Sequence, residues 1–158
     1  MILIALGANL TSPAGSPAET LRAALAALAA NSIGPANISG FRETVAWPDA
    51  DDPPFVNAVA QVTTNLSPPE LLRILHKIER QFGRERGVPN APRTLDLDLL
   101  DYDGRVEEGP PVLPHPRMHT RDFVLEPLAE IAPDWRHPVS GRTAQQLLAE
   151  LSPSKSGQ

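Results

Sequence analysis

The sequence predicts an α+β fold of the ferredoxin-like class, with a βαββαβ core, an antiparallel sheet and C-terminal helical additions. Three observations support this prediction. Apolar and amphipathic stretches follow one another in the order strand, helix, strand, strand, helix, strand. Both helices begin with the same start signal, Ser-Pro-x-Glu, at 16–19 and 67–70. The last strand, within 92–104, alternates Leu with Asp.

The first strand is expected at residues 2–6 (ILIAL), where a short apolar run is followed by Gly7 and Asn9. Ser16 can then cap a helix, Pro17 suits its first position, and Glu19 can complete a capping box. The first helix is therefore expected to continue through TLRAALAALAA.

Two strands are expected next, at 36–46 and 54–64, joined by the acidic, proline-rich WPDADDP. In the second of them, the even positions from 56 to 62 are apolar and share one face, while Phe55, Asn57 and Gln61 lie on the other. This alternation predicts an antiparallel strand with one face in the core.

The second helix is expected to follow the cap at Ser67 and to bury one apolar face. That face comprises Leu71, Leu72, Leu75, Ile78 and Phe82. A further short helix is predicted where Thr143 and Gln146 can form another cap. We expect a single domain over residues 1–151 and a disordered tail at 152–158.

Composition excludes several classes of protein. The 158 residues contain no cysteine, which rules out disulfides, thiolate metal sites and a cysteine nucleophile. A formal net charge of −5 argues against general binding to nucleic acids or anionic membranes. The short, uncharged apolar start is typical of a strand rather than a signal peptide or membrane span. We expect a soluble, cytoplasmic monomer.

The alternating strand offers a candidate metal site. Leu95, Leu97 and Leu99 share one face, so Asp96 and Asp98 lie together on the other. Their α-carbons should be roughly 6.5–7 Å apart, which lets both carboxylates reach one cation or a pair of cations bridged by a ligand. The alternative is the solvated face of a half-buried antiparallel strand.

Two basic segments flank this strand. ERQFGRERGVPNAPR, before it, carries Arg80, Arg84, Arg86 and Arg93; LPHPRMHTRDF, after it, carries His115, Arg117, His119 and Arg121. Guanidinium groups match phosphate oxygens, so arginines beside paired acids predict a metal–polyphosphate ligand. The alternative is a solvated loop with surface ion pairs. Pro116, between the two histidines, argues against a helical zinc pair.

Absent motifs narrow the chemistry further. The chain has no G-x-x-x-x-G-K-[ST] and no G-x-G-x-x-G, so side chains and metal would have to hold nucleotide phosphates. It also lacks G-x-S-x-G, which ranks covalent catalysis low. Direct phosphoryl-type transfer through positioning and electrostatic stabilisation fits these residues best.

Several stretches together resemble the 6-hydroxymethyl-7,8-dihydropterin pyrophosphokinases of folate biosynthesis, over about residues 1 to 150. These stretches are ALGANL, FVNAV, ERQFGRERG, PRTLDLDLLDYDG and LPHPRMHTRDFVLEPLAEIAP. The resemblance implies a ferredoxin-like fold and transfer of the terminal pyrophosphate of ATP to the hydroxymethyl group of the pterin, with release of AMP.

The resemblance also implies roles for individual residues. Asp96 and Asp98 would hold two Mg²⁺ ions that bridge the ATP phosphates and the acceptor hydroxyl, and with Arg84 and Arg93 they form the implied catalytic set. The implied ATP-binding residues are His76, Glu79, Arg84, Arg86, Arg93, Leu99, His115 and Arg121.

For the pterin, the resemblance implies hydrogen bonds from Asn57 and mainly backbone contacts from Gly7, Thr44 and Val45. Phe55 and Phe123 would enclose the flat ring, whereas without the resemblance core packing would be the simpler interpretation of both. Trp47 is expected to add aromatic cover.

Two other classes of function remain open from the sequence. A ferredoxin-like domain can be a regulatory module that binds a nucleotide or another small molecule without chemistry, with the two acids sensing a divalent cation. It can also bind RNA on its sheet, but the acidic charge and the lack of an RNP-like stretch argue against this.

Overall fold

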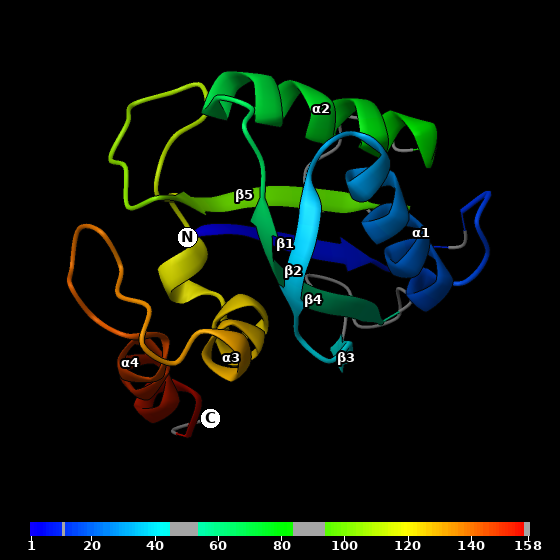
Figure 1. Cartoon of the computed structure of the whole chain (residues 1–158). Helices are drawn as coiled ribbons and strands as arrows, with labels where there is room; N and C mark the ends of the chain where they lie inside the picture. Colours follow the sequence, from blue (N-terminus) through cyan, green and yellow to red (C-terminus); the bar gives the residue numbers. More distant parts are fainter. Residues whose placement is uncertain (11, 45–53, 84–93, 157–158) are drawn as a thin grey trace.

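Three layers make up the described part of the protein. The structure is a computed structural model that describes residues 1–10, 12–44, 54–83 and 94–156, and only the backbone of 152–156. A five-stranded sheet lies in the middle, with α1 and α2 on one face and α3 and α4 on the other (Figure 1). In chain order the elements are β1 (Ile2–Ala8), α1 (Pro17–Ala30), β2 (Gly34–Ile38), β3 (Arg42–Thr44), β4 (Phe55–Thr63), α2 (Pro68–Gln81), β5 (Asp96–Tyr102), a short 3₁₀ helix η1 (Met118–Thr120), α3 (Asp122–Ile131) and α4 (Ala144–Ser156).

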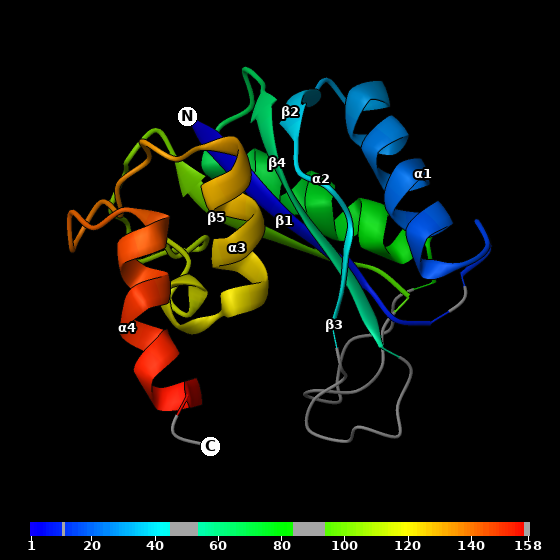
Figure 2. The same ribbon diagram turned by 90° about the horizontal axis from the view of Figure 1, so that it is seen from below.

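The strand order confirms the predicted ferredoxin-like class. Strands lie in the order β2-β4-β1-β5, and β3 pairs with β4. Every adjacent pair is antiparallel. Seen from below, β1 and β4 run through the centre of the sheet between the two helical layers (Figure 2). The two helices of the βαββαβ unit therefore cross the same face, as this topology requires.

The two predicted helix starts are confirmed in detail. The Ser16 hydroxyl accepts the Glu19 N–H, and the Glu19 carboxylate accepts the Ser16 N–H at 3.0 Å. Ser67 and Glu70 repeat this reciprocal capping box at the start of α2. Local sequence alone thus provides partners for two N–H groups at the start of each helix, and the prolines at 17, 68 and 69 have no N–H that needs one.

The strand predicted at 36–46 is divided into β2 and β3, which is a correction. Ser39 lies in the break, where its N–H donates to the Val59 carbonyl at 2.9 Å and its hydroxyl accepts the Val59 N–H at 3.0 Å. Ile38 pairs with Ala60 and Arg42 with Asn57, so one extra residue is accommodated on the edge. The Ser39 hydroxyl thus accepts the Val59 N–H in place of a backbone carbonyl of the neighbouring strand.

Each sheet face has its own core. The even positions of β4 pack on one side with α1 and with most of the predicted face of α2, where Leu71, Leu75 and Ile78 are completely buried. Leu72 of that predicted face is only half-buried and lies outside this cluster. Leu97 and Leu99 of β5, and Leu95 just before it, join the same cluster, which confirms the predicted alternation. The opposite face packs against α3 and α4 through Leu3, Ala5, Val59, Leu100, Met118, Val124, Leu125, Leu128 and Trp135.

A bulge in β5 explains a third aspartate of this strand. The register with β1 shifts after Leu99, so Leu100 and Asp101 both lie on the α3–α4 side. Asp101 is 3% exposed and accepts the indole N–H of Trp135 at 2.8 Å. Its burial is compensated by this bond and by the N–H of Gly104, so Asp101 is structural.

The C-terminal helices differ from the prediction. α3 was not predicted as a separate element, because Pro127 lies inside it and removes one helical hydrogen bond. Burial of Val124, Leu125 and Leu128 stabilises the helix in spite of Pro127. α4 has the predicted Thr143–Gln146 cap but extends to Ser156, five residues beyond the predicted domain end. Within the described ranges, no helix is both long and apolar enough to cross a bilayer.

Candidate functional site

A row of residues crosses the sheet beside α3. Gly7 of β1 pairs with Asn57 of β4 on one side and with Asp96 of β5 on the other. Arg42 of β3 continues the row next to Asn57. Residues opposite one another in antiparallel strands share a face, and this face is the one that packs against α3 and α4. The register therefore places an amide, a glycine and a carboxylate in sequence on the same surface.

Asp98 lies next to two residues of the second basic segment. Its Oδ2 is 3.6 Å from Nη1 of Arg121, and its Oδ1 is 4.0 Å from Nε2 of His115. Arg121 is the residue that immediately precedes α3. The backbone N–H of His115 donates to the Leu100 carbonyl at 2.9 Å, which fixes the histidine to β5. The structure thus brings together Asp98, His115 and Arg121, three of the residues that the sequence analysis expects near a metal–phosphate ligand.

His115 is a neutral hydrogen-bond donor in this arrangement. Burial lowers the pKa of His115 to about 4, and the charge of Arg121 acts in the same direction while Asp96 opposes it. Nδ1 accepts the N–H of Arg117 at 3.1 Å, so the ring proton is on Nε2, the atom that faces Asp98. Sequence reasoning did not identify this role of the Arg117 backbone, because only the turn after His115 creates it.

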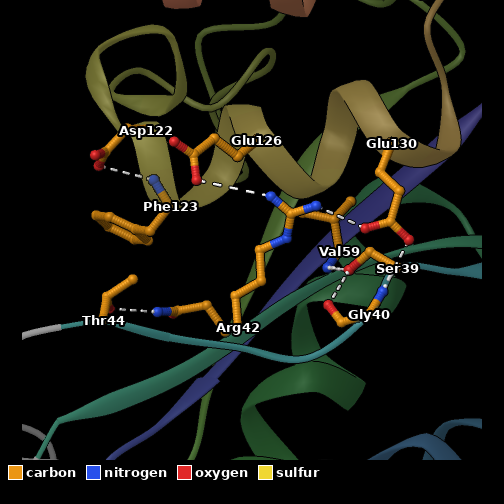
Figure 3. A network of polar contacts seen from close by, with 10 residues as sticks. Ser39, Gly40, Arg42, Thr44, Val59, Asp122, Phe123, Glu126 and Glu130 are labelled. Atoms are coloured by element: carbon orange, nitrogen blue, oxygen red, sulfur yellow. Dashed lines mark hydrogen bonds and ion pairs between the residues drawn. The ribbon is translucent and has the colours of Figure 1, made fainter.

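The residues predicted to bind a flat ring gather on β3, β4 and α3, and β1 separates these strands from Asp98 on β5. Asn57 is 7% exposed, and its Nδ2 donates to the Thr44 hydroxyl at 3.0 Å. Phe55 pairs with Thr44 at the start of β4 and is half-buried. Phe123 is 36% exposed and projects from α3 toward the strand that carries Thr44 (Figure 3). Exposure on this scale does not fit core packing, so the simpler interpretation of Phe123 is wrong.

Gly7 allows the Asn57 amide to lie close to β1. A Cβ at Gly7 would be 2.9 Å from the Asn57 Oδ1, closer than such atoms approach one another. Its next nearest neighbours among the described residues would be the Val56 carbonyl oxygen at 3.9 Å and the Cγ of Asn57 at 4.0 Å. Glycine is therefore required for the position of one polar side chain rather than for the backbone conformation.

The predicted nucleotide-binding residues of α2 lie on the helix that packs on the sheet face opposite to Asp96 and Asp98. Glu79 is 1% exposed, and its Oε2 accepts the N–H of Leu97 at 2.8 Å. Because β5 is an edge strand, this carboxylate provides a partner for an outward-pointing backbone group. His76 is half-buried on the same helix, one turn earlier. The Leu99 side chain is buried in the core, so only its backbone lies on the same edge.

Replacing Glu79 tests this contact. Glu79→Ala should lower the free energy of unfolding by about 1–3 kcal/mol, because the Leu97 N–H would lose its acceptor in a buried position. Glu79→Gln keeps a carbonyl oxygen there and should recover most of that loss. Chemical denaturation of the three proteins without ligand measures the difference. Equal destabilisation by Ala and Gln would contradict the hydrogen-bond explanation.

Some predicted residues cannot be placed. Val45, Trp47, Arg84, Arg86 and Arg93 lie outside the described residues. Within the parts that are described, no group of three or more His, Asp or Glu residues could hold a metal ion. Two carboxylates on one strand nevertheless suit Mg²⁺, which typically takes one or two protein carboxylates and completes its coordination with water and substrate phosphates. The donor set of Asp96 and Asp98 therefore fits that ion.

Comparisons of the sequence with known proteins point to one family. A family model described as 7,8-dihydro-6-hydroxymethylpterin-pyrophosphokinase (HPPK) matches residues 3–133. Three curated relatives carry the name 2-amino-4-hydroxy-6-hydroxymethyldihydropteridine pyrophosphokinase. The relative from Methylorubrum extorquens is 39% identical over 153 residues, covering 96% of this chain and 93% of that protein.

The other two relatives differ in coverage. The relative from Pseudomonas aeruginosa is 41% identical over 155 residues, which span 94% of this chain and 90% of that protein. The relative from Synechocystis sp. is 50% identical over 100 residues, which span 63% of this chain and 51% of that protein. The chain thus matches nearly the whole length of the first two relatives and about half of the third.

Proposed function

This chain belongs to the 7,8-dihydro-6-hydroxymethylpterin pyrophosphokinase family, and we propose that it transfers the terminal pyrophosphoryl group of ATP to the hydroxymethyl group of that pterin, releasing AMP. Membership confirms the resemblance predicted from the sequence and, with it, an ATP-dependent pyrophosphokinase as the class of enzyme. The observation that carries the proposal is the row of Asn57, Gly7 and Asp96 across three adjacent strands. This row supports the proposal, because Asn57, the residue proposed to hydrogen-bond the pterin, would lie near the residues proposed for the phosphates.

The pterin would bind between the sheet and α3. Asn57 offers a carbonyl oxygen and an amide N–H₂, of which one N–H already binds Thr44, so it can both accept from and donate to the amide and amine edge of the ring. Phe55 and Phe123 would cover the two faces of the ring. We assign Gly7, Thr44 and Val45 to the same pocket, as the resemblance implies.

Asp96 and Asp98 would hold two Mg²⁺ ions, which would neutralise the phosphates and lower the pKa of the acceptor hydroxyl when bound. The surrounding residues would orient the triphosphate. Arg121 supplies a guanidinium 3.6 Å from Asp98, and His115 supplies an Nε2–H without adding positive charge. Arg84, Arg86 and Arg93 complete the proposed phosphate contacts. These groups favour direct, in-line attack of the pterin hydroxyl on the β-phosphorus.

The adenosine end of ATP would lie along the outer edge of β5, the edge that does not pair with β1. His76 and Glu79 on α2 border this edge, and the backbone of Leu99 lies on it. We propose that Leu99 contacts adenine through its backbone, because its side chain is in the core. We propose that the chain acts as a monomer.

Identification of the nucleotide product tests this function. The protein is incubated with Mg²⁺, ATP and 6-hydroxymethyl-7,8-dihydropterin, and the products are separated by anion-exchange chromatography. AMP that forms only when the pterin is present is the expected result. ADP would show transfer of a single phosphoryl group and overturn the proposal. ATP binding without turnover would instead support the regulatory module that the sequence left open.

A further inference from the structure

A polar network joins α3 to the edge of the sheet. Nη2 of Arg42 on β3 is 2.8 Å from Oε1 of Glu130, and Nη1 is 3.7 Å from Oε2 of Glu126. The other carboxylate oxygen of Glu130 accepts the N–H of Gly40 at 3.0 Å. Figure 3 shows Arg42 extended between the strand and the helix, with the two glutamates above it. We refer to Arg42, Glu126, Glu130 and the Gly40 N–H as the Arg42 network.

This network lies beside the proposed pterin pocket and contributes no group to it. Arg42 pairs in register with Asn57 and precedes Thr44 by two residues on the same face of β3. Glu126 follows Phe123 by three residues, which puts the two on adjacent turns of the same side of α3. The network therefore connects the strand that supports Asn57 with the helix that carries Phe123.

The strand end of the network is itself held firmly. Ser39 makes two hydrogen bonds to the Val59 backbone, and its hydroxyl also donates to the Gly40 carbonyl at 3.0 Å. Asn37 adds a bond from its Nδ2 to the Ile131 carbonyl at the end of α3, at 3.2 Å. Movement of the helix relative to this edge of the sheet would have to break the Arg42 network as well as the Asn37–Ile131 bond.

We propose that the Arg42 network positions the pterin by holding α3 at a fixed distance from β3, so that Phe123 covers a ring bound to Asn57. This inference rests on the proposed function and adds three residues that the sequence analysis did not assign to the site. Arg42, Glu126 and Glu130 are positioning residues, because they act on the substrate only through Phe123, Thr44 and Asn57.

The charge state and exposure of the network set the kind of effect to expect. The Gly40 N–H and, after it, Arg42 lower the pKa of Glu130, so this carboxylate is ionised at neutral pH. The side chains of Arg42 and Glu130 are 37% and 41% exposed. Ion pairs this exposed contribute little to global stability. Their loss should therefore alter the local spacing of helix and strand without unfolding the chain.

Steady-state kinetics of Arg42→Ala and Glu130→Gln test the proposal. We expect the KM for the pterin to rise about threefold to tenfold, the KM for ATP to stay within about twofold, and the Tm to change by at most a few degrees. Glu126→Gln should have a smaller effect, because its contact is longer. Arg42→Lys should recover part of the loss, since one ammonium can replace the contact with Glu130 but cannot bridge both glutamates.

The chain contains a matched control. Arg142→Ala removes an exposed Arg–Glu pair with Glu150 on α4, and neither residue is among those proposed for the two substrate sites. It should leave the KM for the pterin unchanged. A pterin KM for Arg42→Ala equal to that of Arg142→Ala would overturn the positioning role, and so would a parallel rise of both Michaelis constants together with a large fall in Tm.

A binding titration separates this inference from the proposed function. The pterin is titrated into each variant in the presence of Mg²⁺ and a non-hydrolysable ATP analogue, and the dissociation constant is measured by calorimetry. This arm needs no turnover, so failure of the unmodified chain to form AMP counts against the proposed function alone. Weaker binding in Arg42→Ala than in Arg142→Ala supports the network, and equal binding contradicts it.

Discussion

Replacing Asp98 with Asn should reduce the rate of AMP formation by about 10²–10⁴-fold. The amide keeps the size and position of the side chain on β5 but cannot neutralise a cation as a carboxylate does. It would also leave Arg121 and His115 without the acidic partner from which they are 3.6 Å and 4.0 Å away. Asp96→Asn should have an effect of similar size. The measurement is kcat at saturating ATP and pterin with Mg²⁺ in excess.

The control for this prediction is Asp103→Asn, in the turn directly after β5. Asp103 is exposed and its carboxylate pairs with the terminal amine of Met1 at 2.8 Å, on the far side of the bulge in β5. Its substitution should leave kcat unchanged. An Asp98→Asn variant that retained more than about a tenth of the normal kcat with an unchanged Tm would show that the two carboxylates are only the solvated face of a strand.

Local signals account for most of the predicted fold. The capping boxes at Ser16 and Ser67 and the Leu–Asp alternation of β5 depend on residues within a few positions of one another, so the sequence displays them directly. The division between β2 and β3 depends instead on the bonds of Ser39 with Val59, 20 residues away. α3 is stabilised by its buried face in spite of Pro127, which local propensity cannot foresee.

The site shows the same division between local and long-range information. The spacing of Asp96 and Asp98 predicts that the two aspartates share a face. The structure confirms that this face is not the one that carries Leu97 and Leu99 in the core. The row of Asn57, Gly7 and Asp96 exists only through the register of three strands. The resemblance supplied Asn57 and Gly7, and the structure adds the steric reason for the glycine. The Arg42–Glu130 pair joins residues 88 positions apart and left no local signal.

Substitution of Gly7 by Ala should raise the KM for the pterin by about 10–100-fold with little loss of stability. The new methyl group would lie 2.9 Å from the Asn57 Oδ1, so the amide would have to move. Asn57 cannot move without weakening its bond to Thr44, and the ring would then lose its fixed hydrogen-bonding partner. The backbone has room, because the nearest backbone atom would be the Val56 oxygen at 3.9 Å.

Two further variants decide whether Asn57 is the cause. Gly34→Ala is the control: its Cβ would lie 3.2 Å from the exposed Thr63 hydroxyl on the far end of β4, so the KM should not change. In the double variant with Asn57→Ala, the Gly7 substitution should add nothing to the effect of Asn57→Ala, because the group it displaces is gone. Additive effects of the two substitutions would mean that Gly7 acts on the pterin directly, through space that the ring itself needs.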